Sequence, residues 1–307
     1  MIGKSTPTPH NLIFELCLLG LLALLWGASY LFIKVAVATI PPVSLIAMRV
    51  SVAAVFLIMV MKWRGHSLPK DLKTWKMLLV QSFLNSIGAW TVLAWGQQYV
   101  DSGLASVLNS TSPIFVFFFT LLLTRHETTG LVKMFGALVG LCGVALIVGV
   151  DALAGLGQQV LAQLAVLLGA VMYAGAAIYG KNFSHLPPTV TAACTMIWAS
   201  LVLVPLSLAI DQPWMLQPSF QSLVAALVLS VFCTGIALLI YFRLLRTLGS
   251  IGTASQAYLR AGLGVGLGVI FLGEQVTIFV GIGLTAAILG VAAINYPQRN
   301  KPQTPRL

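Results

Sequence analysis

The sequence predicts an all-α polytopic membrane protein whose ten transmembrane helices form two inverted five-helix repeats, with both termini in the cytoplasm. Composition is the first reason. Of the 307 residues, 59% are hydrophobic and only 8% are charged, which is too little charge for the aqueous surface of a soluble domain. The apolar residues form ten continuous stretches of about 20 residues, the length of helix that crosses a bilayer. Continuous stretches also favour helices over the alternating strands of a membrane β-barrel.

The polar connections between these stretches alternate in charge, and this alternation predicts the topology. One set of connections, like both tails, holds Lys and Arg. These connections are 62–76, 125–133, 181–187 and 243–249. The other set holds only acids: Asp101, Asp151, Asp211 and Glu274. Short connections rich in Lys and Arg stay in the cytoplasm during insertion. The net charge of +10 is therefore mainly a topology signal, and we expect a lipid bilayer and no nucleic acid as partner.

The predicted helices span 12–38, 43–61, 75–98, 103–123, 131–149, 160–180, 188–209, 220–243, 250–272 and 276–296. The first is interpreted as an uncleaved helix, because its apolar core is too long for a signal peptide. The connections are too short to hold a soluble catalytic or nucleotide-binding domain.

The chain repeats itself at a spacing of about 147 residues, which predicts two domains, 1–150 and 151–307. The equivalent features are Pro41-Pro42 and Pro187-Pro188, Glu127 and Glu274, and the stripes Gly136, Gly140, Gly143 and Gly283, Ala287, Gly290. Because each repeat has an odd number of helices, the two repeats must lie in opposite orientations across the membrane. Inverted repeats of this kind are typical of alternating-access transporters, whose substrate sites lie near the bilayer midplane.

These features follow one another in the order found in a known family. Pro-Pro after the first helix, Arg49 in the second, Pro113 in the fourth and an acid before the glycine-striped fifth resemble the EamA-type branch of the drug/metabolite transporter superfamily. The resemblance covers roughly residues 12–296. It implies an inner-membrane secondary transporter that exports small metabolites, with amino acids, aromatic ones among them, a prominent substrate class.

Arg260 is the first candidate for solute binding. It lies about ten residues into its predicted helix, hence roughly 15 Å deep, where an unpartnered arginine is costly. No predicted helix carries a carboxylate at this depth, so a carboxylate of the solute is a natural partner for the guanidinium. The alternative is an arginine bonded to backbone carbonyls. In the repeat, Arg260 is equivalent to Pro113. The family usually has proline or small residues at this position.

Polar and aromatic side chains at a similar depth complete the predicted site. Asn109 and Gln256 are equivalent in the repeat and lie one turn before Pro113 and Arg260. Their amides suit a zwitterion, or they tie helices together. The aromatic and remaining polar candidates are Trp26, Tyr30, Asn85, Trp90, Tyr173, Tyr179 and Tyr258. Such a set suits an amino acid with an aromatic or large apolar side chain, although aromatic stripes often serve packing alone.

Three further residues are predicted to have gating or structural roles. Lys34 ends the stripe that begins at Trp26, and it either leads out of the cavity or anchors the helix at the headgroups. Arg49 is expected to pair with an acid or a carbonyl near the outer side, without solute contact. Pro113 matches a family proline. The glycine stripes indicate close helix packing, with a homodimer contact as an alternative.

The sequence disfavours catalysis. The helices contain no nucleophile with a base at shared depth, as an intramembrane enzyme would need. The cysteines, Cys17, Cys142, Cys194 and Cys233, show no metal-ligand spacing, so we expect neither cofactor nor metal. The prediction is a transporter of amino acids with aromatic or large apolar side chains. A multidrug or other metabolite exporter is the alternative, and a receptor is less favoured because the loops are minimal.

Overall fold

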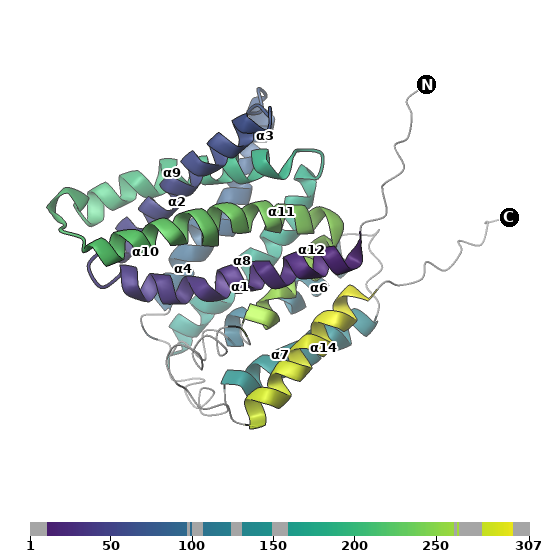
Figure 1. Cartoon of the computed structure of the whole chain (residues 1–307). Helices are drawn as coiled ribbons and strands as arrows, with labels where there is room; N and C mark the ends of the chain where they lie inside the picture. Colours follow the sequence, from purple (N-terminus) through teal and green to yellow (C-terminus); the bar gives the residue numbers. More distant parts are fainter. Residues whose placement is uncertain are drawn as a thin grey trace, which may run out of the picture.

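The computed structural model describes residues 11–96, 99, 107–123, 131–148, 159–260, 263 and 278–296, and every regular element within them is helical (Figure 1). The α-helices are α1 (Leu12–Ala36), α2 (Pro42–Trp63), α3 (Leu72–Ser82), α4 (Gly88–Gly96), α6 (Ser112–Leu123), α7 (Leu131–Val148), α8 (Val160–Tyr179), α9 (Pro188–Ile210), α10 (Phe220–Ser230), α11 (Ala237–Thr247), α12 (Gly249–Ala254) and α14 (Ile278–Asn295). The all-α class is therefore confirmed for the described residues.

Five of the described segments are long and apolar enough to cross a membrane: 12–29, 42–63, 160–183, 188–210 and 220–247. Shorter apolar helices occupy 107–122, 131–146 and 281–295. These segments lie where the sequence predicts membrane helices. Parts of the predicted helices 103–123 and 250–272 lie outside the described residues. The count of ten crossings and the cytoplasmic termini stay predictions.

The two Pro-Pro pairs perform the same task in each repeat. Pro42 and Pro188 are the first residues of α2 and α9, and the preceding prolines have extended backbones with ψ of 149° and 139°. A proline fits the first helical position because its missing N–H has no helical partner there anyway. The Pro-Pro pair that recurs in the sequence therefore marks the start of equivalent helices.

Each repeat also contains one π-helical segment at the same place. Phe83–Ile87 joins α3 to α4, and Val231–Ile236 joins α10 to α11. The two segments start about 147 residues apart, at the spacing of the sequence repeat. A π-helical turn inside an α-helix is rare, and such turns occur frequently at functional sites. Both segments contribute to the cavity wall or to contacts with it.

Helices α7 and α14 lie side by side (Figure 1), and their glycine stripes pack against each other. A Cβ atom built on Gly136 would lie 2.9 Å from the carbonyl oxygen of Gly290, and one on Gly143 would lie 2.6 Å from that of Gly283. A later residue of α7 thus meets an earlier residue of α14, so the two helices are antiparallel. This is the relation expected between equivalent helices of inverted repeats. The stripes are covered within one chain, which leaves them unable to form the homodimer contact considered from the sequence.

Equivalent helices α2 and α9 are also antiparallel neighbours. Near the start of α2, the Ser44 backbone N–H donates to Asp211 Oδ2 at 2.7 Å, and the Ser44 and Ser207 hydroxyls lie 2.9 Å apart. Beyond the end of α2, His66 Nδ1 and Thr189 Oγ1 lie 2.8 Å apart. Two helix pairs, α7 with α14 and α2 with α9, therefore join the repeats.

The close packing of α14 on α7 predicts a position-specific cost for adding one methyl group. Gly290→Ala should destabilise the protein by about 1–3 kcal/mol, because the new Cβ would lie 2.6 Å from the Gly136 carbonyl oxygen. Gly281→Ala on the same helix is the control, since nothing lies within 4 Å of its added Cβ. Thermal unfolding of the purified protein in detergent measures both. Equal unfolding temperatures for the two variants would contradict the described packing.

Candidate functional site

A cavity of about 200 Å³ lies between the two repeats. The first repeat contributes side chains from α1, α2, the first π-helical segment, α4 and the start of α6, and the second contributes them from α8, α10, α11, α12 and the residues that follow. The lining residues are Trp26, Ser29, Ile33, Pro42, Leu45, Ile46, Arg49, Asn85, Trp90, Leu93, Asn109, Ser112, Tyr173, Ala177, Leu229, Tyr241, Ala254, Gln256, Ala257 and Arg260. Most of the wall is apolar, with a few polar groups, as in small-molecule sites generally.

The cavity brings together most of the predicted site residues, although they are far apart in the sequence. Those that line it are Trp26, Asn85, Trp90, Asn109, Tyr173, Gln256 and Arg260. Two of the pairs among them are related by the repeat: Trp26 with Tyr173, and Asn109 with Gln256. The wall is therefore built from equivalent positions of both halves.

Arg260 lies against α1 and is partly buried. A Cβ atom on Gly27 would lie 3.4 Å from the Arg260 carbonyl oxygen and 3.6 Å from its Cγ atom. These are ordinary contact distances, so Arg260 packs against α1 next to Trp26 with room at position 27 for a methyl group but not for a large side chain. A guanidinium in this position adds positive charge to a mostly apolar wall and can hold a carboxylate with two N–H donors.

Two amide oxygens in the wall have no hydrogen-bond partner among the described residues. Asn109 and Gln256 are 6% and 8% exposed, and Asn109 Oδ1 and Gln256 Oε1 are both buried without a donor. Buried acceptors of this kind are costly unless something donates to them. Because both residues line the cavity, a donor group on a bound solute would satisfy them.

The aromatic side chains form an apolar part of the wall. The rings of Trp26 and Tyr241 lie 5.6 Å apart at 44°, within the range of favourable aromatic pairs. Tyr173 and Trp90 line the cavity from α8 and α4. An apolar group of a solute would therefore be enclosed by rings from both repeats.

Arg49 is expected to pair with a carbonyl or an acid and not to face the solute. It does contact a carbonyl: its terminal nitrogen lies 3.5 Å from the Cys233 oxygen, and Arg49 Nε donates to Thr234 Oγ1 at 2.6 Å. Its guanidinium also stacks over the Trp90 ring at 4.3 Å. The unexpected finding is that Arg49 lines the cavity.

Two predicted aromatic residues lie outside the wall. Tyr258 is fully buried against α7, where its hydroxyl donates to the Ala137 carbonyl oxygen at 2.8 Å and its ring packs over Gly140. Tyr179 stacks edge-on against Phe183 at 5.9 Å near the end of α8. Both residues are explained by helix packing. The prediction failed because the depth of a residue in the membrane does not show which face of its helix it occupies.

The remaining predicted residues are less informative. Pro113 is the second residue of α6, a position where proline is well tolerated. Tyr30 and Lys34 belong to α1, but their side chains lie outside the described part of the structure. No group of three or more His, Cys, Asp or Glu side chains among the described residues could hold a metal ion.

Sequence reasoning missed several residues of the wall, including Ser29, Ser112 and Tyr241. Tyr241 follows the second π-helical segment by five residues, and nothing in the sequence showed that segment. The two serines bond to backbone carbonyls three residues earlier in the chain, with Ser29 Oγ 2.6 Å from the Trp26 oxygen and Ser112 Oγ 2.7 Å from the Asn109 oxygen. Small hydroxyl residues of this kind carry little signal in a sequence.

Comparison with known families gives two matches along the chain. Residues 13–149 and 160–296 each match the EamA-like transporter family. The matched segments start at 13 and 160, which agrees with the repeat spacing of about 147 residues found in the sequence. Together they contain every residue of the cavity wall.

Known sequences and solved structures are similar to nearly the whole chain. The "Uncharacterized inner membrane transporter YedA" of Escherichia coli (strain K12) is 25% identical over 92% of this chain and 91% of its own length. The "Uncharacterized transporter YoaV" of Bacillus subtilis (strain 168) is 26% identical, covering 89% of this chain and 94% of its own length. A crystal structure superposes with a TM-score of 0.78 at 18% identity, over 90% of this chain and 96% of the other, which supports the fold.

Proposed function

Because the chain belongs to the EamA-like transporter family, we propose that it exports small amphipathic solutes across the inner membrane by alternating access. Amino acids with aromatic or large apolar side chains are the proposed substrate class. The family and the relatives named as transporters make it a membrane transporter. The inner-membrane assignment rests on the E. coli relative's name together with the apolar helices.

One observation carries the choice of solute. A guanidinium and two unpartnered amide oxygens, from Arg260, Asn109 and Gln256, face one mostly apolar cavity. An α-amino acid presents the complementary groups: a carboxylate that accepts from the guanidinium, and an ammonium that donates to the amide oxygens. The rings of Trp26 and Tyr241 then enclose the side chain. The ammonium would thus give the two amide oxygens the donor that they lack among the described residues.

A general exporter of uncharged compounds is less well supported by the same wall. Such a transporter needs an adaptable apolar surface, and buried amide oxygens without donors would weaken its binding of apolar solutes. The alternative nevertheless makes a distinct prediction, since its flux would not depend on Arg260.

Removal of the Arg260 guanidinium should abolish most amino-acid transport. Arg260→Ala is expected to lower the uptake efficiency for phenylalanine in proteoliposomes roughly 10- to 100-fold, the value of a charge-assisted hydrogen bond. Arg260→Lys keeps the charge and should retain part of the activity. The amount of inserted, folded protein serves as control. Unchanged phenylalanine flux in Arg260→Ala would remove this residue from the site.

A large side chain at Gly27 on α1 should also lower amino-acid transport, because it would displace Arg260 without changing the guanidinium itself. Gly27→Leu is expected to push Arg260 from its position and to lower phenylalanine uptake roughly tenfold. Gly27→Ala is the matched control, because its Cβ would make only ordinary contacts of 3.4 Å and longer. Comparison of KM and maximal rate for the two variants provides the measurement. Loss of transport in both, or in neither, would argue against the described contact.

A further inference from the structure

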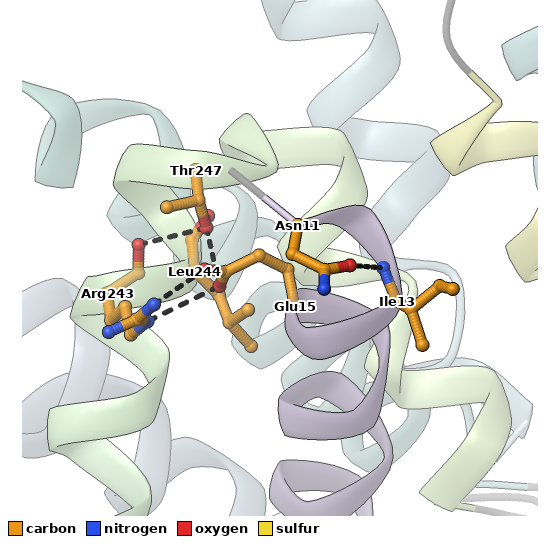
Figure 2. Close-up of polar contacts among 6 residues, drawn as sticks. All are labelled: Asn11, Ile13, Glu15, Arg243, Leu244 and Thr247. Carbon is orange, nitrogen blue, oxygen red and sulfur yellow. Dashed lines mark hydrogen bonds and ion pairs between the residues drawn. The ribbon is translucent and has the colours of Figure 1, made fainter. Parts of the chain in front are cut away.

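An ion pair with a buried carboxylate joins the start of α1 to the end of α11. The Glu15 carboxylate accepts from Arg243 at 2.8 Å and 3.4 Å and from the Thr247 hydroxyl at 3.0 Å. Figure 2 shows the three side chains meeting between the two helices. We call Glu15, Arg243 and Thr247 the charge latch. We propose that the charge latch holds this end of the protein closed and that it has to open when solute passes there.

The geometry of the charge latch favours one arrangement of α1 and α11. Glu15 is 1% exposed and Arg243 is 46% exposed. Arg243 Nε and Nη2 reach one carboxylate oxygen each, which is the strong, forked form of this ion pair. A buried carboxylate that loses its cation is costly. Glu15 therefore gives up Arg243 only when the helices separate far enough for water to reach the carboxylate.

Fully buried leucines separate the charge latch from the cavity. Leu19 and Leu22 of α1 and Leu244 of α11 are 0% exposed and are not part of the cavity wall. On α1, the wall begins beyond them, at Trp26. Packed side chains therefore fill the space between α1 and α11 on the latch side of the cavity.

The cavity itself extends away from the charge latch. Its lining residues on α1 run from Trp26 to Ile33, and on α2 they include Pro42, the first residue of that helix. Because α1 ends at Ala36, these residues lie towards the end of α1 that is opposite to Glu15. The wall thus reaches towards one end of α1, and the charge latch lies at the other.

The contact between α1 and α11 also forms part of the cavity wall. The rings of Trp26 on α1 and Tyr241 on α11 lie 5.6 Å apart, and both residues line the cavity. Tyr241 precedes Arg243 by only two residues, so the ring pair and the charge latch belong to the same helix contact. Separation of the helices at the latch would move the two rings apart as well. The cavity would then open towards the start of α1.

The repeat relates the charge latch to a contact of different chemistry. At a spacing of about 147 residues, Glu15 corresponds to Ala162, and Gly96 corresponds to Arg243. These two equivalents also touch, since a Cβ atom on Gly96 would lie 2.8 Å from the Ala162 carbonyl oxygen. Equivalent contacts of an inverted repeat lie on opposite faces of the membrane. Loss of the ion pair should therefore change access from one face and leave the contact between α4 and α8 intact.

A purely local role of Glu15 is the alternative to be separated from the latch. Glu15 lies in the first turn of α1, where a negative charge interacts favourably with the helix dipole. Asn11 caps the same turn by accepting from the Ile13 backbone N–H at 3.1 Å. Both features act within α1 and do not depend on α11. Arg243→Gln removes the ion pair and leaves them unchanged, so the test needs substitutions on both helices.

Access to the cavity from each face of the membrane tests the proposal. Ser29→Cys places a thiol in the cavity wall, and a membrane-impermeant maleimide labels it in right-side-out and inside-out vesicles. Labelling of the same chain without Ser29→Cys is subtracted, because Cys17 is exposed. A separate Arg246→Cys variant, exposed on α11, shows which vesicles present the face where α1 begins. The access ratio is the labelling from this face divided by that from the other.

Loss of either partner should raise the access ratio. Glu15→Gln and Arg243→Gln should each raise it roughly five- to tenfold, because the ion pair stabilises only the closed arrangement. The double variant should resemble the single variants, since both substitutions remove the same interaction. Arg243→Lys keeps the charge without the fork and should have a smaller effect. Arg246→Gln removes an exposed charge from the same helix and, as the matched control, should leave the ratio unchanged.

Three results would overturn the proposal. The first is a wild-type access ratio in both Glu15→Gln and Arg243→Gln. The second is an increase in Glu15→Gln alone, which would assign Glu15 to the start of α1. The third is an equal increase in Arg246→Gln, which would make the net charge of this face the cause. If Arg243→Gln does not fold, Glu15→Gln and Arg243→Lys decide.

The proposal rests on the proposed alternating access, but not on the identity of the solute. Labelling of Ser29→Cys needs no substrate, so it gives a result even if phenylalanine is not transported. Absence of saturable phenylalanine uptake would contradict the proposed substrate class and leave the charge latch standing. An unchanged access ratio beside normal phenylalanine uptake would overturn the charge latch and leave the substrate class standing.

Discussion

The structure depends on one constraint: equivalent helices of the two repeats pack antiparallel and close together. Backbone groups inside a bilayer must be satisfied within helices, and apolar side chains gain little from leaving lipid, so helices associate through small residues that allow close contact. The stripes Gly136, Gly140, Gly143 and Gly283, Ala287, Gly290 meet this requirement by facing each other across α7 and α14. The pairing fixes the inverted arrangement, and the inverted arrangement places a cavity where the halves meet.

Function arises where the side chains depart from the symmetry of the backbone. Both halves have the same helix starts and equivalent π-helical segments. At equivalent positions, however, Arg260 stands where the first repeat has Pro113, and Glu15 stands where the second repeat has Ala162. The first difference adds the Arg260 guanidinium to the part of the mostly apolar wall that comes from the second repeat. The second provides an ion pair at one end of the fold and small-residue packing at the other. The helices at the two ends of the fold are therefore held together by different kinds of contact.

The sequence predicted the helical class, the positions of most helices and the repeat, because composition and stretch length reflect the bilayer directly. It also predicted much of the cavity wall, since depth within a helix and equivalence between repeats identify residues such as Asn109 and Gln256. It failed for Tyr258, which packs on Gly140, because depth does not give the face of a helix. It also failed for Tyr241, because the π-helical segment that precedes it leaves no pattern in the sequence. The sequence also did not predict that Arg49 lines the cavity, because this depends on distances between helices that the hydrophobic pattern of a sequence does not give.

The central claim is that the cavity binds a zwitterion, with the carboxylate on Arg260 and the ammonium on the amide oxygens of Asn109 and Gln256. Calorimetric titration of the purified protein with phenylalanine, 3-phenylpropanoate and phenylalaninamide tests it most directly, because these ligands share the ring and lack one charged group in turn. The account predicts that phenylalanine binds at least about tenfold more tightly than either of the others. Equal affinity for all three, or tighter binding of the amide, would contradict it.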